Sequence, residues 1–320
     1  MNYKKIVVAG GGVLGSQIAY QTAYSGFEVN ILIRKEDNKD EVINKLNKLH
    51  DNYIDAINLM EKDTTNWCRG IADIDSFDKK ECVKNADEAL DRIKIIDDQK
   101  EALSDADLLI ESITEDIKIK AMLYKSISTI LPAKTVVVTN SSTLLPSKLC
   151  KFTGRKEKFL AMHFANAIWK NNISEIMKHS ETEDKYFNEI IEFAKAIRMI
   201  PLPVNKEKSG YLLNSMLVPF LLSAMDLLAN GVSDPESIDK AWKLGTGAPN
   251  GPFEIIDVVG LETCKNIVMQ YQKVPNIIDP LLKKMMLPYN YNGMLKILNE
   301  YMDAGKTGKA CGEGFYKYNK

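Results

Sequence analysis

A glycine-rich turn between a strand and a helix constrains this chain more than any other feature. Residues 5–15 read KIVVAGGGVLG, in which IVVA predicts a buried strand and Gly10, Gly12 and Gly15 follow in the spacing GxGxxG. Residues 16–24 then carry apolar side chains at helical spacing. Gly10 permits a tight turn, Gly12 lets a pyrophosphate approach the backbone, and Gly15 lets the helix pack on the strand. Because the start of a helix attracts phosphate, the segment predicts a dinucleotide-binding unit, with a turn that binds nothing as the alternative.

The composition is typical of a soluble globular protein and excludes several functions. Hydrophobic residues make up 45% of the 320 residues and charged residues 27%. The net charge of -1 gives no reason to expect nucleic acid or an anionic membrane as a partner. Residues 211–225 are the most apolar later stretch, but Asn214, Ser215 and Pro219 interrupt them, which predicts a buried helix rather than a membrane span.

The cysteines indicate the compartment. The chain has five, scattered without a CxxC pair, which argues against a disulfide framework and against a zinc or other metal site. The N-terminal segment does not have the pattern of a secretory signal. We therefore expect a protein of the reducing cytoplasm.

The order of predicted elements indicates two domains. Strands alternate with helices over residues 1–205, which predicts a Rossmann-type, doubly wound α/β sheet. Residues 206–320 show helices and almost no strands, so we expect a smaller all-α domain for substrate binding and dimerisation, with a boundary at the prolines and charges of 201–208. The expected strands are 28–33, 108–113, 135–139 and 159–164, the expected helices 40–62 and 117–131, and residues 63–84 are expected to form an exposed excursion. The apolar helices after 206 predict a homodimer.

Three histidines are candidates for proton transfer. His50 and His179 lie in polar surroundings, so we expect both at the solvated surface. His163 instead ends a predicted strand, at the edge where open α/β sheets hold ligands. Asn140-Ser141-Ser142 ends the neighbouring strand. His163 is therefore either a general acid/base or a packed structural histidine.

Four segments together resemble one family. They are the glycine turn, ADLLIESITEDIKIK at 106–120, NSSTL at 140–144 with FLAMHFAN at 159–166, and GTGAPNGPFEIID at 245–257 with GEGFY at 312–316. In this order they resemble the 3-hydroxyacyl-CoA dehydrogenase family, of the short 3-hydroxybutyryl-CoA type.

The resemblance implies roles for particular residues. His163 would take the hydroxyl proton of substrate as hydride leaves for the nicotinamide, and Glu175 would orient the imidazole. Ser142 and Asn214 would hydrogen-bond the reacting oxygen. The residues expected to contact the cofactor or to line its edge of the site are the three glycines, Arg34, Glu115, Lys120, Asn140 and Asn166.

One departure from the dinucleotide pattern concerns the cofactor. An acid at the end of the second strand usually holds the ribose 2′-OH, but here the position is Ile33, followed by Arg34 and Lys35. An apolar side chain accepts no hydrogen bond, whereas Arg34 suits a 2′-phosphate. The cofactor is therefore expected to be NAD(P), with NADP(H) accepted; the alternative is that Arg34 stacks on adenine or faces water.

Other departures concern coenzyme A. The loop after the catalytic strand reads FANAIW at 164–169, without the family's proline. Residues 63–81, with Arg69 inside, are longer and unlike the family's arm. Near the C-terminus Ala310-Cys311-Gly312 replaces the family's lysine, leaving Lys309 as a substitute.

The favoured function is interconversion of a 3-hydroxyacyl-CoA and a 3-oxoacyl-CoA in fatty acid metabolism. One alternative is a dehydrogenase of a hydroxy acid without CoA, similar to L-gulonate or carnitine dehydrogenases. A second is a dinucleotide-binding protein without catalytic activity, although His163, Glu175, Ser142 and Asn214 together argue against it.

Overall fold

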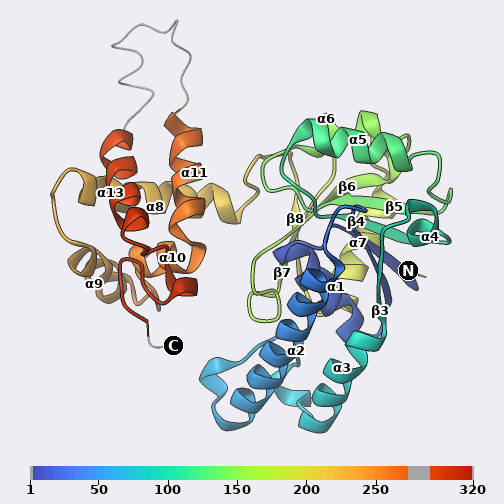
Figure 1. Cartoon of the computed structure of the whole chain (residues 1–320), viewed down its shortest axis with the longest axis horizontal. Coiled ribbons are helices and arrows are strands. Elements are labelled where there is room, and N and C mark those ends of the chain that lie inside the picture. Colours follow the sequence, from blue (N-terminus) through green and yellow to red (C-terminus); the bar gives the residue numbers. More distant parts are fainter. Residues whose placement is uncertain (1–2, 273–288, 319–320) are drawn as a thin grey trace, which may run out of the picture. The chain divides into compact units, whose positions relative to one another are not determined.

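The computed structural model describes residues 3–272 and 289–318 (Figure 1). The chain divides into two compact units, Met1–Leu212 and Leu213–Lys320.

The first unit contains one sheet of eight strands in the order β3-β2-β1-β4-β5-β6-β7-β8. All neighbouring pairs are parallel except β6 and β7, which are antiparallel. The register pairs Ala9 with Glu111 and Glu111 with Thr139, so these strands end at one edge. The strands are β1 (Lys5–Ala9), β2 (Glu28–Leu32), β3 (Ile93–Ile96), β4 (Leu108–Glu111), β5 (Val136–Thr139), β6 (Phe159–Phe164), β7 (Ile173–Met177) and β8 (Ile200–Val204).

Helices cover both faces of this sheet because successive strand residues point to opposite sides. Ile6 and Val8 belong to one core and Val7 and Ala9 to the other. The first core is covered by α1 (Val13–Tyr24), α2 (Lys39–Lys62), α3 (Lys79–Asp91) and α7 (Asp184–Ala196). The second is covered by α4 (Gln99–Leu103), α5 (Ile117–Ile127) and α6 (Pro146–Leu149).

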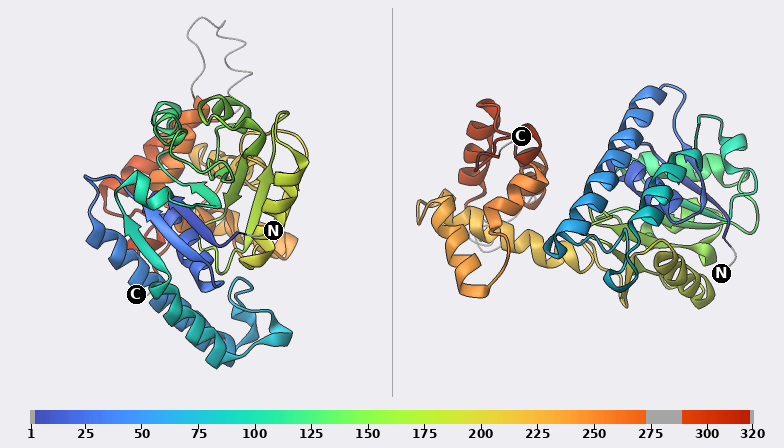
Figure 2. Two further views of the ribbon diagram at one scale, coloured as in Figure 1. Left: turned by 90° about the vertical axis from the view of Figure 1, so that its right-hand side faces the viewer. Right: turned by 90° about the horizontal axis from the view of Figure 1, so that it is seen from below.

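A helical arm projects from the sheet. Figures 1 and 2 show α2 and α3 side by side, extending away from the strands. Asn38 caps α2 by accepting from the Asp40 N–H, and Asp78 caps α3 in the same way. The helix predicted at 40–62 is thus confirmed, and most of its apolar stripe is buried, although Ile43 is exposed.

The segment predicted as an exposed excursion at 63–84 is only partly so. Cys68, Ile71 and Ala72 are buried in the first core, and α3 begins at Lys79. The expectation was wrong for these residues because so short an apolar group has no readable period, although it packs into the first core.

The predicted strands and the helix at 117–131 are confirmed within a few residues, whereas β7, α7 and β8 are among the elements that were not predicted. Pro201 and Pro203 lie inside β8. A proline removes a backbone donor and is tolerated on an edge strand such as β8, which pairs on one side only.

The second unit is helical in its described residues, apart from two isolated bridges near the C-terminus. Its core gathers around Phe253, Leu261 and Leu298. Asp257 accepts from the backbone N–H groups of Phe315 and Tyr316, which fixes the C-terminal segment to α10. The helices are α8 (Leu213–Ala229), α9 (Pro235–Thr246), α10 (Pro252–Val259), α11 (Leu261–Gln272) and α13 (Tyr291–Asp303). The predicted α/β sheet followed by an all-α part is therefore confirmed.

No helix in the described part of the chain is both long and apolar enough to cross a bilayer.

Candidate active site

A chain of hydrogen bonds links three side chains at the end of β6. His163 Nδ1 lies 2.9 Å from Glu175 Oε2, and His163 Nε2 lies 3.1 Å from Ser142 Oγ. Glu175 reaches the imidazole because β7 is antiparallel to β6, with Glu175 directly opposite His163. Only 5% of His163 and 1% of Glu175 are exposed to solvent. Three of the predicted catalytic residues are thus brought together.

The carboxylate of Glu175 determines the imidazole tautomer. An ionised carboxylate only accepts hydrogen bonds, so Nδ1 carries the proton and its N–H donates a hydrogen bond to Glu175. Nε2 then offers its lone pair to the Ser142 hydroxyl. The Leu212 N–H donates to Glu175 Oε1 at 2.8 Å, which holds the carboxylate in place. The result is an oriented base whose reactive nitrogen faces Ser142.

Tyr211 packs on the imidazole. Its ring lies 4.6 Å from that of His163 at an interplanar angle of 14°. Its hydroxyl donates to the backbone oxygen of Ser141 at 2.8 Å, and burial raises the pKa of Tyr211 far above its usual range. Tyr211 is therefore a neutral positioning residue, and sequence reasoning did not identify it.

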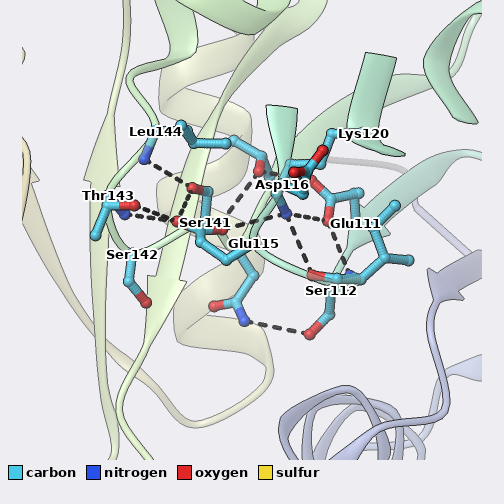
Figure 3. Close-up of polar contacts among 12 residues, drawn as sticks. Glu111, Ser112, Glu115, Asp116, Lys120, Ser141, Ser142, Thr143 and Leu144 are labelled. Atoms are coloured by element: carbon cyan, nitrogen blue, oxygen red, sulfur yellow. Dashed lines mark hydrogen bonds and ion pairs between the residues drawn. The ribbon is translucent and has the colours of Figure 1, made fainter. Parts of the chain in front are cut away.

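Glu115 holds the loop that carries Ser142 (Figure 3). Its Oε1 accepts from the Ser141 hydroxyl at 2.5 Å and from the Thr143 N–H at 2.8 Å and hydroxyl at 2.7 Å. Burial opposes ionisation of Glu115, but these hydrogen bonds and the nearby Lys120 charge give it a pKa below the usual range. Glu115, which was expected to contact the cofactor, is thus hydrogen-bonded to both neighbours of Ser142.

Lys120 is buried beneath this loop. Its Nζ lies 2.6 Å from Glu111 Oε1 and 3.4 Å from Glu115 Oε2. Glu111 also accepts from the hydroxyls of Tyr124 and Thr139 at 2.8 Å each. Sequence reasoning gave Glu111 no role; the available signal was an acid that ends an otherwise apolar, buried strand.

Asn140 links the ends of three strands. Its Oδ1 accepts from the Phe164 N–H at 3.0 Å, next to His163, and its Nδ2 donates to Ser112 Oγ at 3.3 Å. Asn166 is exposed, and its backbone oxygen accepts from Asn171. Asn214 is the second residue of α8 and belongs to the second unit.

The glycine turn opens onto a groove of about 1020 Å³. Gly10 has φ +116°, and a Cβ there would lie 2.4 Å from the Ser112 backbone oxygen; a Cβ on Gly15 would lie 2.1 Å from the Gly10 oxygen. A Cβ on Gly12, by contrast, would meet nothing within 4 Å, so space is open above the residue that caps α1. The turn, the helix start and the groove together fit a dinucleotide pyrophosphate.

Arg34 lines the same groove and is paired with acids of its own loop. Its Nη2 lies 2.7 Å and its Nε 3.2 Å from Asp37 Oδ1, and its Nη1 lies 3.3 Å from Glu36. The hydrogen bond from Arg34 lowers the pKa of Asp37. Ile33 lies at the end of β2 and is buried.

His179 corrects a prediction. It was expected at the surface but is buried, because its Nε2 donates to the Lys156 oxygen at 3.1 Å and its Nδ1 accepts from the Glu181 N–H at 3.2 Å. Burial lowers the pKa of His179, which favours the neutral ring. Within the described residues, Cys150, His179 and Glu181 are close enough to hold an ion, but both ring nitrogens are already used. His50 is partly exposed and contacts Asp87.

Two segments that depart from the family pattern pack together. The Gly70 N–H donates to the Trp169 oxygen at 3.0 Å, and a Cβ on Gly70 would lie 2.8 Å from both Cα and O of Trp169. Gln17 accepts from the Ala167 N–H at 2.8 Å, and the Tyr53 ring lies 5.5 Å from that of Trp169. We call these contacts the Gly70–Trp169 junction; it joins the segment after α2 to the loop after β6.

Comparisons with known proteins agree with this geometry. Residues 5–208 match the NAD-binding domain of 3-hydroxyacyl-CoA dehydrogenases, and residues 210–318 match the C-terminal domain of the same proteins. The chain belongs to the 3-hydroxyacyl-CoA dehydrogenase family. The resemblance in the sequence is thereby confirmed, and the chain is an oxidoreductase with an NAD-binding domain.

Relatives match over nearly their whole length. A probable 3-hydroxyacyl-CoA dehydrogenase of Caenorhabditis elegans is 31% identical over 328 residues, covering 98% of this chain and 92% of the relative. Human mitochondrial hydroxyacyl-coenzyme A dehydrogenase is 30% identical over 315 residues, covering 98% and 91%. Among solved structures, a diketoreductase described as acting on dicarbonyl compounds is 42% identical with a TM-score of 0.78, covering 99% of this chain and 100% of the other. FadB2 of M. tuberculosis is 25% identical with a TM-score of 0.75, covering both chains completely.

Proposed function

We propose that this family member interconverts a 3-hydroxyacyl-CoA and a 3-oxoacyl-CoA, with His163 as the general acid/base. The observation that carries the proposal is the chain Ser142–His163–Glu175, at the strand ends that also hold the glycine turn. The bound nicotinamide supplies or accepts the hydride. A protein that only senses a dinucleotide needs no such oriented base, which makes that alternative less favourable.

His163 transfers the proton in this proposal, and the residues around it stabilise the charges that form. In the oxidative direction Nε2 of His163 takes the hydroxyl proton of the substrate, and the imidazolium that forms is stabilised by Glu175. In the reductive direction Nε2 returns the proton. Ser142 donates to the reacting oxygen, and we assign Asn214 the same task from the family pattern, so that both stabilise charge on that oxygen. Lys120 and Glu115 act indirectly, by holding the loop of Ser142.

The cofactor proposal is NAD(P), with NADP(H) accepted. The buried Ile33 offers no acceptor to a ribose 2′-OH, and Arg34 and Lys35 line the groove. Asp37 competes for the Arg34 guanidinium, so a 2′-phosphate would have to displace a carboxylate. We therefore propose acceptance of NADP(H) without assigning it a strong preference.

A second candidate substrate is a dicarbonyl compound without CoA. The diketoreductase is 42% identical to this chain, whereas the quoted hydroxyacyl-CoA dehydrogenases are 30–31% identical. The Gly70–Trp169 junction also joins two of the segments in which the chain departs from the family pattern. This candidate keeps the same acid/base chemistry and changes only what lies beyond the reacting carbonyl.

One experiment separates the candidates. Reduction of acetoacetyl-CoA and of a dicarbonyl compound without CoA is followed by nicotinamide absorbance, with NADH and NADPH in parallel. Faster turnover of acetoacetyl-CoA supports the first proposal, and turnover of the CoA-free compound alone supports the second. His163→Gln should abolish either activity while NADH binding survives; unchanged activity in that variant would refute the role of His163.

Association and compartment complete the proposal. We propose a homodimer through the helices of the second unit, since Met216, Val232, Leu244 and Val258 are each at least 65% exposed there. Light scattering coupled to gel filtration tests this, and a monomer at all concentrations would refute it. All five cysteines are free thiols among the described residues, which supports the cytoplasm as the compartment.

A further inference from the structure

A second pocket lies in the first unit, with a volume of about 540 Å³. Its lining includes Arg69, Lys195 and Arg198, together with Asn85 and Asn172. None of its lining residues belongs to the Ser142–His163–Glu175 chain or to the dinucleotide groove. A pocket of this size matches a small metabolite.

Two arginines line this pocket. Within the described residues, neither Arg69 nor Arg198 makes a side-chain hydrogen bond or an ion pair, although Asp73 and Glu81 also line the pocket. Lys195 pairs with Glu192, and both are exposed. The guanidiniums are therefore available to a ligand.

The backbone of Arg198 supports a role for its side chain. Arg198 has φ +60°, just after the end of α7, where its N–H donates to the Lys195 oxygen and the Met199 N–H donates to the Ala194 oxygen. A left-handed residue at the end of a helix is usually glycine, and in this protein Gly247 has that conformation at the end of α9. A side chain here costs backbone stability, so its presence needs another reason.

The charge of Arg198 acts on two buried side chains, Tyr24 and Cys82. Burial raises the pKa of Tyr24 and of the Cys82 thiol, and the positive charge of Arg198 opposes both increases. Tyr24 lines the pocket. Asn172 donates to the Arg198 backbone oxygen at 2.9 Å, which fixes this part of the wall.

We propose that this pocket binds a phosphate group, either as free phosphate or on a small metabolite, between Arg69 and Arg198. Guanidinium groups bind phosphate oxygens in bidentate geometry. The Lys195 ammonium adds positive charge, and the Asn85 amide adds a donor. The site is separate from catalysis and does not depend on the substrate proposal.

The test is the response of thermal unfolding to phosphate in the full-length protein. Inorganic phosphate and glycerol 3-phosphate are titrated separately against potassium chloride at equal ionic strength, with NADH saturating the dinucleotide groove. We expect either or both phosphates to raise the Tm, and the difference between them distinguishes the two sources. Calorimetry should show that Arg69→Gln weakens binding by roughly tenfold or more, as expected for one lost charge-assisted pair.

Arg198→Gly gives the sharper result because it should raise the Tm without phosphate and abolish the rise in Tm that phosphate causes. Without phosphate we expect a higher Tm than in the wild type, since glycine relieves the left-handed backbone. Adding phosphate should not raise the Tm of this variant any further. The control variant is Lys185→Gln, which removes one exposed charge from α7, the helix that precedes Arg198, at a position outside the pocket. Its Tm should respond to phosphate as that of the wild type does.

Three outcomes overturn the proposal. One is the absence of any phosphate response in the wild type. Another is an equal response in the wild type, Arg69→Gln and Arg198→Gly, which places the anion elsewhere. The third is a lower Tm for Arg198→Gly without phosphate, which makes the arginine a structural residue.

Discussion

Replacing Lys120 by methionine tests whether this residue supports the fold or contacts the cofactor. The ammonium is 1% exposed and pairs with Glu111, which is fully buried. Methionine keeps most of the side-chain volume but leaves the carboxylate with only neutral donors: the hydroxyls of Tyr124 and Thr139 and the Ile113 N–H. An uncompensated buried charge is then the main cost.

The magnitude follows from that geometry. Breaking a buried ion pair by removing one partner costs about 3–5 kcal/mol of stability. Three hydrogen-bond donors to Glu111 remain, so we expect Lys120→Met to cost about 3 kcal/mol. For a domain of about 200 residues, each kcal/mol lowers the Tm by roughly 2–4 °C, so we expect a decrease of roughly 6–12 °C. Urea unfolding followed by circular dichroism, beside calorimetry, measures both quantities.

A double-mutant cycle separates pairing from other effects. Glu111→Gln combined with Lys120→Met should cost clearly less than the sum of the single changes, because neither leaves the other charge unpaired. Lys118→Met, at an exposed position of the same helix, should stay within about 0.5 kcal/mol of the wild type. A cost below about 1 kcal/mol for Lys120→Met, with NADH binding weakened more than tenfold, would refute the structural role.

Three further changes have defined outcomes. Gly70→Ala should destabilise the protein by about 1–3 kcal/mol, because its Cβ would lie 2.8 Å from the Trp169 backbone. The displaced loop should also raise KM for the oxo substrate. An unchanged free energy of unfolding and an unchanged KM would contradict this. Asp37→Asn removes one of the two carboxylate charges that compete for the Arg34 guanidinium, so kcat/KM with NADPH should rise several-fold relative to NADH. An unchanged ratio would mean that Arg34 does not meet the ribose. Because the pKa of Glu115 is lowered in the fold, its ionised form adds stability above the unfolded pKa of about 4.3, and this is lost as the pH falls through the folded value. The Tm of Glu115→Gln should therefore fall less steeply on acidification; identical slopes would contradict the assignment.

The sequence identified much of the candidate active site for physical reasons. Parallel strands end on one side of the sheet, so polar residues that follow buried runs, such as Ser142 and His163, come together there. Glu175 required the family pattern, because its place opposite His163 depends on an antiparallel strand. That strand is β7, which was not predicted.

The remaining differences come from tertiary contacts that local patterns do not encode. The pattern marked Lys120, but only the packing of α5 on the sheet shows that it is buried against Glu111. Pro201 and Pro203 indicated a linker, although an edge strand accommodates them. His179 follows a lysine in a polar stretch, yet two backbone groups satisfy its ring inside the protein.

The Gly70–Trp169 junction restricts how this protein can be redesigned. The loop after β6 is fastened both to Gly70 and, through Gln17, to α1. A loop transplanted from a relative would therefore lose its anchors unless the segment after α2 and the facing residue of α1 were transplanted with it. Libraries that aim to alter substrate scope should vary these three segments as one block, and sequences recovered from them should show correlated changes at Gly70 and Trp169.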